Sequence, residues 1–143
     1  MHMIEFVIPG EAVAQGRPRA SINRRGKIQV RDPEKSKDFK SYVKLLASQN
    51  RPKVLLSGPL AVELRVYKPI LKSFTLKEKE AAKQGIKRPI TKPDLDNHAK
   101  GVLDAMNKII YKDDAQIVDL VVSKFYSDYP RVEVFIKELS DDG

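Results

Sequence analysis

The chain has 143 residues, a length that predicts one domain with its own hydrophobic core rather than two independent domains. Lys and Arg outnumber Asp and Glu by 27 to 19, which favours a polyanionic partner, and the absence of cysteine excludes disulfides, thiolate zinc sites and cysteine nucleophiles. No apolar run approaches the roughly 20 residues of a membrane span and no signal peptide is recognisable, so we expect a cytoplasmic protein that binds nucleic acid rather than membrane.

The first predicted strand covers residues 4–8. Ile4, Phe6 and Ile8 alternate with positions that would face away from a core, and Pro9 and Gly10 end the alternation. A period of two residues is typical of a strand with one buried face, so we expect this segment to lie in a sheet.

A basic hairpin is predicted over residues 17–31. This segment reads RPRASINRRGKIQVR, and residues 23–26 suit a turn between two short strands. Its positive charges could protect a free sheet edge or bind phosphates, and the net positive charge of the chain favours phosphates. The candidate DNA-binding residues here are Arg17, Arg19, Arg24, Arg25 and Lys27.

A helix is predicted to follow the hairpin, because Asp32 suits its N-cap and Pro33 suits its first helical position. Apolar side chains then recur at helical spacing and predict one stripe that packs in the core. We expect the tyrosine of this stripe to pack rather than to stack on a base. The stripe consists of Phe39, Tyr42, Val43 and Leu46.

Residues 60–89 are predicted to form a strand and then an exposed helical insertion. The insertion, residues 71–89, has a capping-box start at Thr75 and Glu78 and a stop at Gly85. The alternating apolar residues of the strand are Leu60, Val62, Leu64 and Val66. The side chains of the insertion that could face a core are Leu76, Ala81 and Ala82.

Residues 92–124 concentrate acidic side chains in an otherwise basic chain. A helix is predicted to begin near Asp94, with an apolar stripe on one face and a polar stripe on another. The apolar stripe contains Leu95, Ala99, Val102, Leu103, Met106 and Ile110. The polar stripe contains Asp96, Lys100, Asp104 and Asn107. One face of this helix is therefore expected to pack while the other carries the site.

The acidic side chains of this segment are candidate ligands of Mg²⁺ or Mn²⁺, which prefer oxygen. Asp94 and Asp96 would lie about 200° apart on a helix, so they converge only if Asp94 is the N-cap. Asp113 and Asp114 precede the next predicted strand and would point in different directions, so either one could complete the site. Each pair also has a purely structural explanation, as a helix start or as a turn.

Basic and imidazole side chains around the acidic cluster have more than one interpretation. Lys100 lies one turn after Asp96 and could pair with it or stabilise charge on a phosphate. Lys92 and Lys124 could bind phosphates or extend into solvent, and we interpret them as DNA-binding candidates. His98 is predicted to be a packing or surface residue rather than a ligand.

Two final strands are predicted at residues 117–126 and 132–136, with a turn at residues 127–130. The order of strands and helices predicts an α/β or α+β domain, in which helices pack on a mixed sheet.

The acidic segment resembles the signature of the RusA family of Holliday junction resolvases, many of which are encoded by phages and prophages. The resemblance rests on KPDLDN, the following Lys100, LDAMN and YKDDAQIVDLVVSK in this order. The RPR segment and DPEKSKDF resemble one branch of the family more loosely.

The resemblance implies a RusA-like fold and a homodimeric, Mg²⁺-dependent endonuclease that acts in DNA recombination and repair, with Mn²⁺ as a substitute ion. Such an enzyme resolves four-way DNA junctions by paired symmetric incisions. Asp94, Asp96 and Asp114 match the essential acidic residues of the family, Lys100 matches its essential lysine, and Asp113 is an additional candidate ligand. Two other functions stay open: a non-catalytic protein that binds branched DNA, and a nuclease specialised for flaps or forks.

Overall fold

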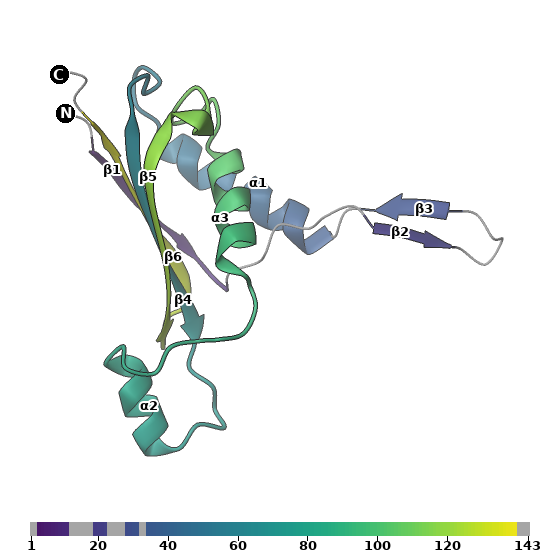
Figure 1. Cartoon of the computed structure of the whole chain (residues 1–143), viewed down its shortest axis with the longest axis vertical. Helices are drawn as coiled ribbons and strands as arrows, with labels where there is room; N and C mark the ends of the chain where they lie inside the picture. Colours follow the sequence, from purple (N-terminus) through teal and green to yellow (C-terminus); the bar gives the residue numbers. More distant parts are fainter. Residues whose placement is uncertain (1–2, 12–18, 23–27, 32–33, 140–143) are drawn as a thin grey trace.

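The structure is a computed structural model that describes residues 3–11, 19–22, 28–31 and 34–139. Its centre is a mixed sheet of four strands in the order β1-β6-β4-β5, shown in Figure 1. The strand β6 runs antiparallel to both β1 and β4, whereas β5 runs parallel to β4. The strands are β1 (Met3–Pro9), β4 (Leu60–Pro69), β5 (Ile117–Ser127) and β6 (Arg131–Glu138).

Two helices, α1 (Glu34–Gln49) and α3 (Leu95–Ala105), lie on the same side of this sheet (Figure 1). The core forms between them and the alternate apolar side chains of the strands, among them Ile8, Leu64 and Val134. Burial of one such side chain stabilises the fold by about 1.5–3 kcal/mol. The predicted α+β architecture, with helices on a mixed sheet, is confirmed.

The apolar stripe of α1 is narrower than predicted. Val43 and Ala47 are fully buried, and Phe39 and Leu46 are packed against the core at its edge. Tyr42 is 38% exposed, so the prediction that it packs in the core is wrong. Each helical residue turns the side chain by about 100°, which places Tyr42 on the flank of the stripe centred on Val43. The predicted N-cap and first helical position, residues 32 and 33, lie outside the described residues.

The predicted basic hairpin is present as two antiparallel strands, β2 (Arg19–Ile22) and β3 (Ile28–Arg31). It extends away from the main sheet (Figure 1). The expected turn at residues 23–26 lies outside the residues that the structure describes. So do four of the candidate DNA-binding residues, Arg17, Arg24, Arg25 and Lys27.

The helix α2 (Leu76–Lys83) lies at one end of the sheet (Figure 1). The predicted capping box is present, because the Glu78 amide donates to Thr75 Oγ1 over 3.1 Å and the Thr75 amide donates to Glu78 Oε1 over 3.1 Å. Gly85 follows the helix with φ of 77°, in the left-handed region that favours glycine. Ala82 is buried, but Leu76 is 85% exposed, because this helix touches the sheet only on one side. The prediction that Leu76 could face a core is therefore wrong.

Aromatic and cation–π contacts attach the segment around α2 to the far end of β5. The rings of Phe74 and Tyr126 meet edge to face with centroids 5.3 Å apart. The guanidinium carbon of Arg88 lies 4.0 Å from the centroid of the Phe125 ring. Residues 71–89 thus fold as an extension whose position is fixed by one strand.

The helix α3 begins where predicted and ends earlier than predicted. Leu95 is its first residue, and its last is Ala105, so Met106, Asn107 and Ile110 lie beyond it. The chain leaves the helix through Lys108, whose φ is 63°. Met106 and Ile110 are nevertheless buried in the hydrophobic core, and the Ile110 amide donates a hydrogen bond to the Met106 carbonyl oxygen.

The last two strands are confirmed, but they are not neighbours. β4 lies between β5 and β6, so the turn at residues 127–130 connects strands that do not pair with each other.

Candidate active site

The start of α3 places Asp94 and Asp96 close together on different backbone conformations. Asp94 is the N-cap residue, with extended backbone angles of φ −64° and ψ 136°, whereas Asp96 lies in the first helical turn. Within the described structure the carboxylate of Asp94 makes no capping hydrogen bond, so it is not committed to the helix that it precedes. The two aspartates were expected to converge only if Asp94 lay outside the helix, and the structure places it there.

A cavity of about 450 Å³ lies beside α3 and β5. It brings together Asp96 and Lys100 from the helix and Asp114, which is distant in the sequence. Three of the four predicted catalytic side chains therefore share one cavity, and Asp94 lies at the N-cap beside it. The described residues that line the cavity are Leu95, Asp96, Ala99, Lys100, Leu103, Asp114, Leu120 and Val122.

Asp114 enters this cavity from a short 3-10 helix, η1 (Asp114–Gln116). Its amide donates a hydrogen bond of 2.8 Å to Asn107 Oδ1, which ties the turn before β5 to the end of α3. Burial raises the pKa of the Asp114 carboxyl, and its neighbours Asp113 and Asp104 raise it further. A cation bound beside Asp114 would offset both effects and favour its ionised form.

Asp113 has a different environment from its neighbour. Its Oδ1 accepts a hydrogen bond of 3.1 Å from the Ala115 amide, and Gln116 Oε1 accepts one of 2.9 Å from the Asp113 amide. The hydrogen bond from Ala115 lowers the pKa of Asp113. Asp113 therefore caps η1 while Asp114 faces the cavity, a distinction that the spacing of the sequence left open.

Asp104 also belongs to the acidic cluster around Asp114. It was predicted to lie on the polar stripe of α3 but was not among the predicted site residues. Its carboxylate acts on Asp114 strongly enough to raise the pKa of that residue. Lys40 Nζ of α1 lies 3.8 Å from Asp104 Oδ2. The signal that could have identified it was its position two turns after Asp96 on the same helical face.

Tyr111 supports the turn that carries Asp113 and Asp114. It is fully buried, and its hydroxyl donates a hydrogen bond of 2.7 Å to the carbonyl oxygen of Leu103. Burial raises the pKa of Tyr111, with a further contribution from the negative charges of Asp114 and its acidic neighbours. The neutral phenol therefore links the acidic turn rigidly to α3.

The turn that leads into α3 is held by two lysines of the sheet. Lys124 Nζ donates to the carbonyl oxygens of Thr91 and Pro93 over 2.7 and 3.1 Å. Lys68 Nζ donates to Thr91 Oγ1 over 3.0 Å and also to the carbonyl oxygen of Lys92. Burial lowers the pKa of Lys68, and the nearby charge of Lys124 lowers it further.

His98 packs in the core and is not part of the cavity. It is fully buried, and its ring centroid lies 5.4 Å from that of Phe39. The prediction of a packing role is confirmed.

The donor set of the cavity suits an oxygen-preferring divalent cation in kind, because its candidate ligands are all carboxylates. The raised pKa of Asp114 also fits a site that is completed by a positive charge. In residues 3–11, 19–22, 28–31 and 34–139, no three imidazole or carboxylate side chains already converge as a metal site. The carboxylates would therefore have to move closer together to share an ion.

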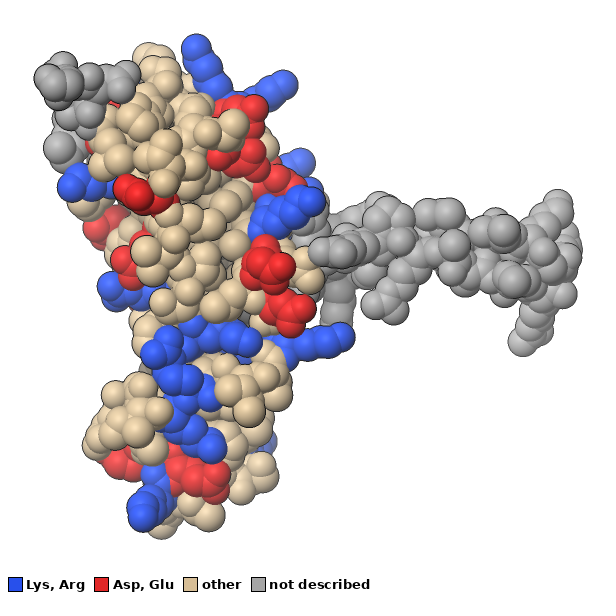
Figure 2. Space-filling view, viewed as in Figure 1, with Lys and Arg blue, Asp and Glu red and all other residues tan. Residues whose placement is uncertain are grey.

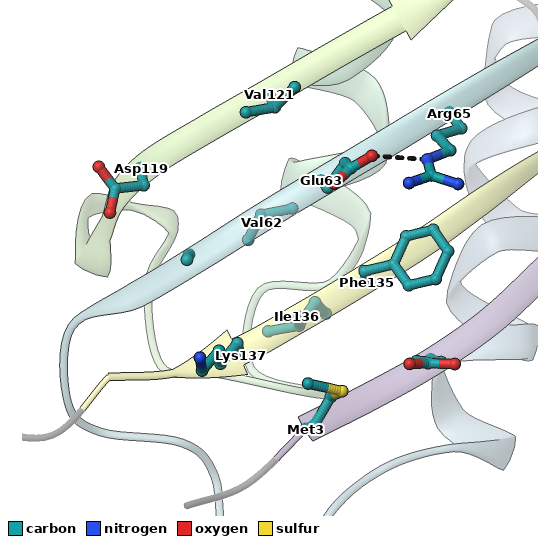
Figure 3. A pocket seen from close by; sticks show the side chains of 11 residues that line it. Met3, Val62, Glu63, Arg65, Asp119, Val121, Phe135, Ile136 and Lys137 are labelled. Atoms are coloured by element: carbon teal, nitrogen blue, oxygen red, sulfur yellow. Dashed lines mark hydrogen bonds and ion pairs between the residues drawn. The ribbon is translucent and has the colours of Figure 1, made fainter.

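A second cavity of about 330 Å³ lies on the opposite face of the sheet, away from α1 and α3. Figure 3 shows Arg65 joined to Glu63 and placed near Phe135 on this face. Arg65 Nε lies 2.6 Å from Glu63 Oε2. This cavity is separated by the sheet from Asp96, and it takes no part in the acidic site.

Charge is distributed unevenly over the face that carries α3. Figure 2 shows acidic side chains along α3 and a belt of basic side chains between them and α2. Acid next to base on one surface suits a metal held against a phosphate backbone. Over the part of the chain that the structure describes, no helix has the length and apolar character needed to cross a membrane.

Comparison with known proteins gives a family match over most of the chain and a relative of similar length. The family model described as Endodeoxyribonuclease RusA matches residues 9–137. The chain is also 58% identical over 142 residues to a Bacillus subtilis (strain 168) protein described as "Uncharacterized protein YqaN". That similarity covers 98% of this chain and 99% of the relative.

Proposed function

This chain belongs to the RusA family of endodeoxyribonucleases, and we infer that it cleaves DNA. Nucleases of this family generally depend on a divalent metal ion and bind branched DNA. We propose that the protein is a Mg²⁺-dependent Holliday junction resolvase of DNA recombination and repair, in which Mn²⁺ can replace Mg²⁺. The observation that carries this proposal is the shared cavity of Asp96, Lys100 and Asp114.

Asp94, Asp96 and Asp114 are the proposed ligands of the metal ion. Asp96 and Asp114 already line the cavity, and the extended N-cap backbone leaves the Asp94 carboxylate able to turn towards it. Asp113 is a weaker candidate, because its carboxylate caps η1. When bound, a divalent ion supplies Lewis-acid polarisation of a phosphate oxygen and a lower pKa for an attacking water.

Lys100 is the proposed electrophilic partner of the phosphate. It lies one helical turn after Asp96, on the exposed face of α3 and at the rim of the same cavity. Its ammonium group can therefore contact a phosphate oxygen on which negative charge increases in the transition state. Because α3 is packed on the core through Val102 and Leu103, the helix holds Asp96 and Lys100 at a fixed spacing.

Basic residues outside the cavity are proposed to bind DNA phosphates. The contacts would give affinity that falls steeply with salt, while the shape of the junction would supply selectivity. The proposed residues are Arg17, Arg19, Arg24, Arg25 and Lys27 of the hairpin segment, together with Lys92.

A homodimer is proposed because a four-way junction has approximate two-fold symmetry and needs two incisions. The strand β5 is an edge of the sheet, and Val118 and Val121 on it are 60% and 55% exposed. A long edge strand with exposed apolar side chains favours pairing with another chain. We propose a second copy of this protein as that chain.

A labelled synthetic four-way junction tests the proposed function beside a linear duplex, a flap and a fork of the same sequence, each with Mg²⁺ and with EDTA. The proposal predicts paired, metal-dependent incisions in the four-way junction and an intact linear duplex. Faster cleavage of flaps or forks would assign the protein to another branched-DNA nuclease class. Binding without cleavage in either Mg²⁺ or Mn²⁺ would indicate a non-catalytic junction-binding protein.

A further inference from the structure

The turn that precedes α3 depends on side chains from the sheet for its hydrogen bonds. The segment lies between the α2 extension and α3 and belongs to no strand. Lys124 Nζ donates to the carbonyl oxygens of Thr91 and Pro93, and Lys68 Nζ contacts Thr91 Oγ1 and the Lys92 carbonyl oxygen. Two ammonium groups thus supply the donors that a strand or helix would otherwise provide.

The two lysines come from two strands that pair with each other in the sheet. Lys68 and Lys124 lie on β4 and β5, which run parallel along their whole length. Lys124 is also bound through its backbone, because Arg88 Nε donates to its carbonyl oxygen while the Arg88 guanidinium covers the ring of Phe125. The carbonyl of Lys124 holds the α2 extension, and its ammonium holds the turn into α3.

The turn held in this way directly precedes the proposed metal ligands. Pro93, whose carbonyl oxygen accepts from Lys124 over 3.1 Å, is bonded to Asp94, and Asp96 follows within the first turn of α3. Charge-assisted hydrogen bonds are stronger than those between neutral groups. Loss of the Lys124 ammonium would release two carbonyl groups immediately before the acidic site.

We propose that Lys124, assisted by Lys68, is a positioning residue that holds residues 91–93 so that Asp94 and Asp96 can share a metal ion with Asp114. This inference rests on the proposed function and departs from the sequence-based prediction that Lys124 binds DNA. It also gives the α2 extension a role, because Arg88 connects that extension to Lys124.

The variant Lys124→Met tests the proposal, since it keeps an unbranched apolar side chain and removes the ammonium. The matched control is Lys137→Met, which alters an exposed strand lysine on β6. Three quantities are measured for each: Mn²⁺ affinity by titration calorimetry, kcat and KM on a four-way junction, and junction affinity in EDTA as a function of salt.

For a positioning residue we expect Lys124→Met to weaken Mn²⁺ binding and to lower kcat, each by about 10–100-fold, as for groups that orient metal ligands. Junction affinity in EDTA and its salt dependence should match those of Lys137→Met. A weaker junction affinity with a salt slope reduced by about one phosphate contact, and unchanged Mn²⁺ affinity, would overturn the proposal in favour of direct DNA binding.

Amide hydrogen exchange of residues 90–97 separates this inference from the proposed function. Faster exchange of this segment in Lys124→Met than in Lys137→Met supports the positioning role even if the wild-type protein cleaves no junction. Unchanged exchange would overturn it, whatever the nuclease activity. If Lys124→Met does not fold, Lys68→Met provides the same three comparisons, with a smaller expected change because Lys124 remains.

Discussion

Asp113 and Asp114 are adjacent in the chain, but the pKa values of their carboxyl groups are shifted in opposite directions. The pKa of Asp113 is lowered by the hydrogen bond from the Ala115 amide, whereas burial and acidic neighbours raise that of Asp114. The sequence predicted that only one of them would serve the site, and it could not decide which, because the choice depends on the 3-10 turn of η1. The sequence also did not identify Asp104 as a neighbour of Asp114, because tertiary structure brings these two residues together.

The raised pKa of Asp114 predicts opposite effects of Asp114→Asn on activity and on stability. Cleavage should fall by at least about 100-fold, more than for loss of a group that only orients a ligand. In EDTA the variant should be more stable than the wild type at neutral pH, since the wild type must hold an unfavourable charge. The pKa of Asp114 is higher in the folded state than in the unfolded state. Its stabilising contribution to the free energy of unfolding is therefore fully present below about pH 4 and is lost as the pH rises through the folded-state pKa.

Urea unfolding in EDTA from about pH 4 to pH 8 measures this difference. The stability of the wild type relative to Asp114→Asn should fall as the pH rises. A constant difference across this range would contradict the raised pKa.

At the scale of single elements, the start of α3 could be predicted and its end could not. Asp94 after a proline and before an apolar stripe carries the local signal of an N-cap, which sequence periodicity detects. No glycine follows Ala105 to mark the end of the helix in the sequence. The chain instead turns after α3, and the Lys108 amide donates a hydrogen bond to the backbone carbonyl oxygen of Tyr111. Asp96 and Lys100 were predicted to lie on one face of this helix because they are four residues apart.

The helix α2 gives a prediction for an element that is stabilised locally. Thr75→Ala removes the side-chain acceptor of the capping box and should destabilise α2 by about 1 kcal/mol. Amide exchange of residues 76–83 should accelerate, while the thermal midpoint of the whole protein changes little, because α2 lies at the end of the sheet. The comparison variant Leu64→Ala, in the core, should lower the free energy of unfolding of the whole protein by about 2–5 kcal/mol. A similar loss of global stability in Thr75→Ala would show that α2 is part of the cooperative core.

The order of the strands in the sheet could not be predicted from the sequence. Period-two patterns predicted β1, β4, β5 and β6, but such a pattern does not identify the partner of a strand. The insertion of β4 between β5 and β6, and its parallel pairing with β5, bring Asp114 next to α3. The cavity therefore depends on non-local pairing, although both acidic residues that line it, Asp96 and Asp114, were already site candidates from the sequence.

The exposed edge of β5 gives a prediction about assembly. Val121→Lys places a charge on this edge and should shift the proposed dimer to monomer in sedimentation analysis, with paired incisions replaced by single nicks. The matched control is Val54→Lys, at a 79% exposed position in the loop before β4. A Val121→Lys protein that remains dimeric and makes paired incisions would place the dimer interface elsewhere.

We propose that metal-dependent cleavage takes place at the cavity lined by Asp96, Lys100 and Asp114. The most direct test is to measure four-way junction binding without divalent ions, and cleavage with Mg²⁺, for wild type and Asp96→Asn. The substitution keeps the size of the side chain and removes the charge of one proposed ligand. We predict unchanged junction affinity and loss of both incisions. Cleavage at the wild-type rate, or loss of binding together with cleavage, would contradict the assignment of Asp96 to the metal site.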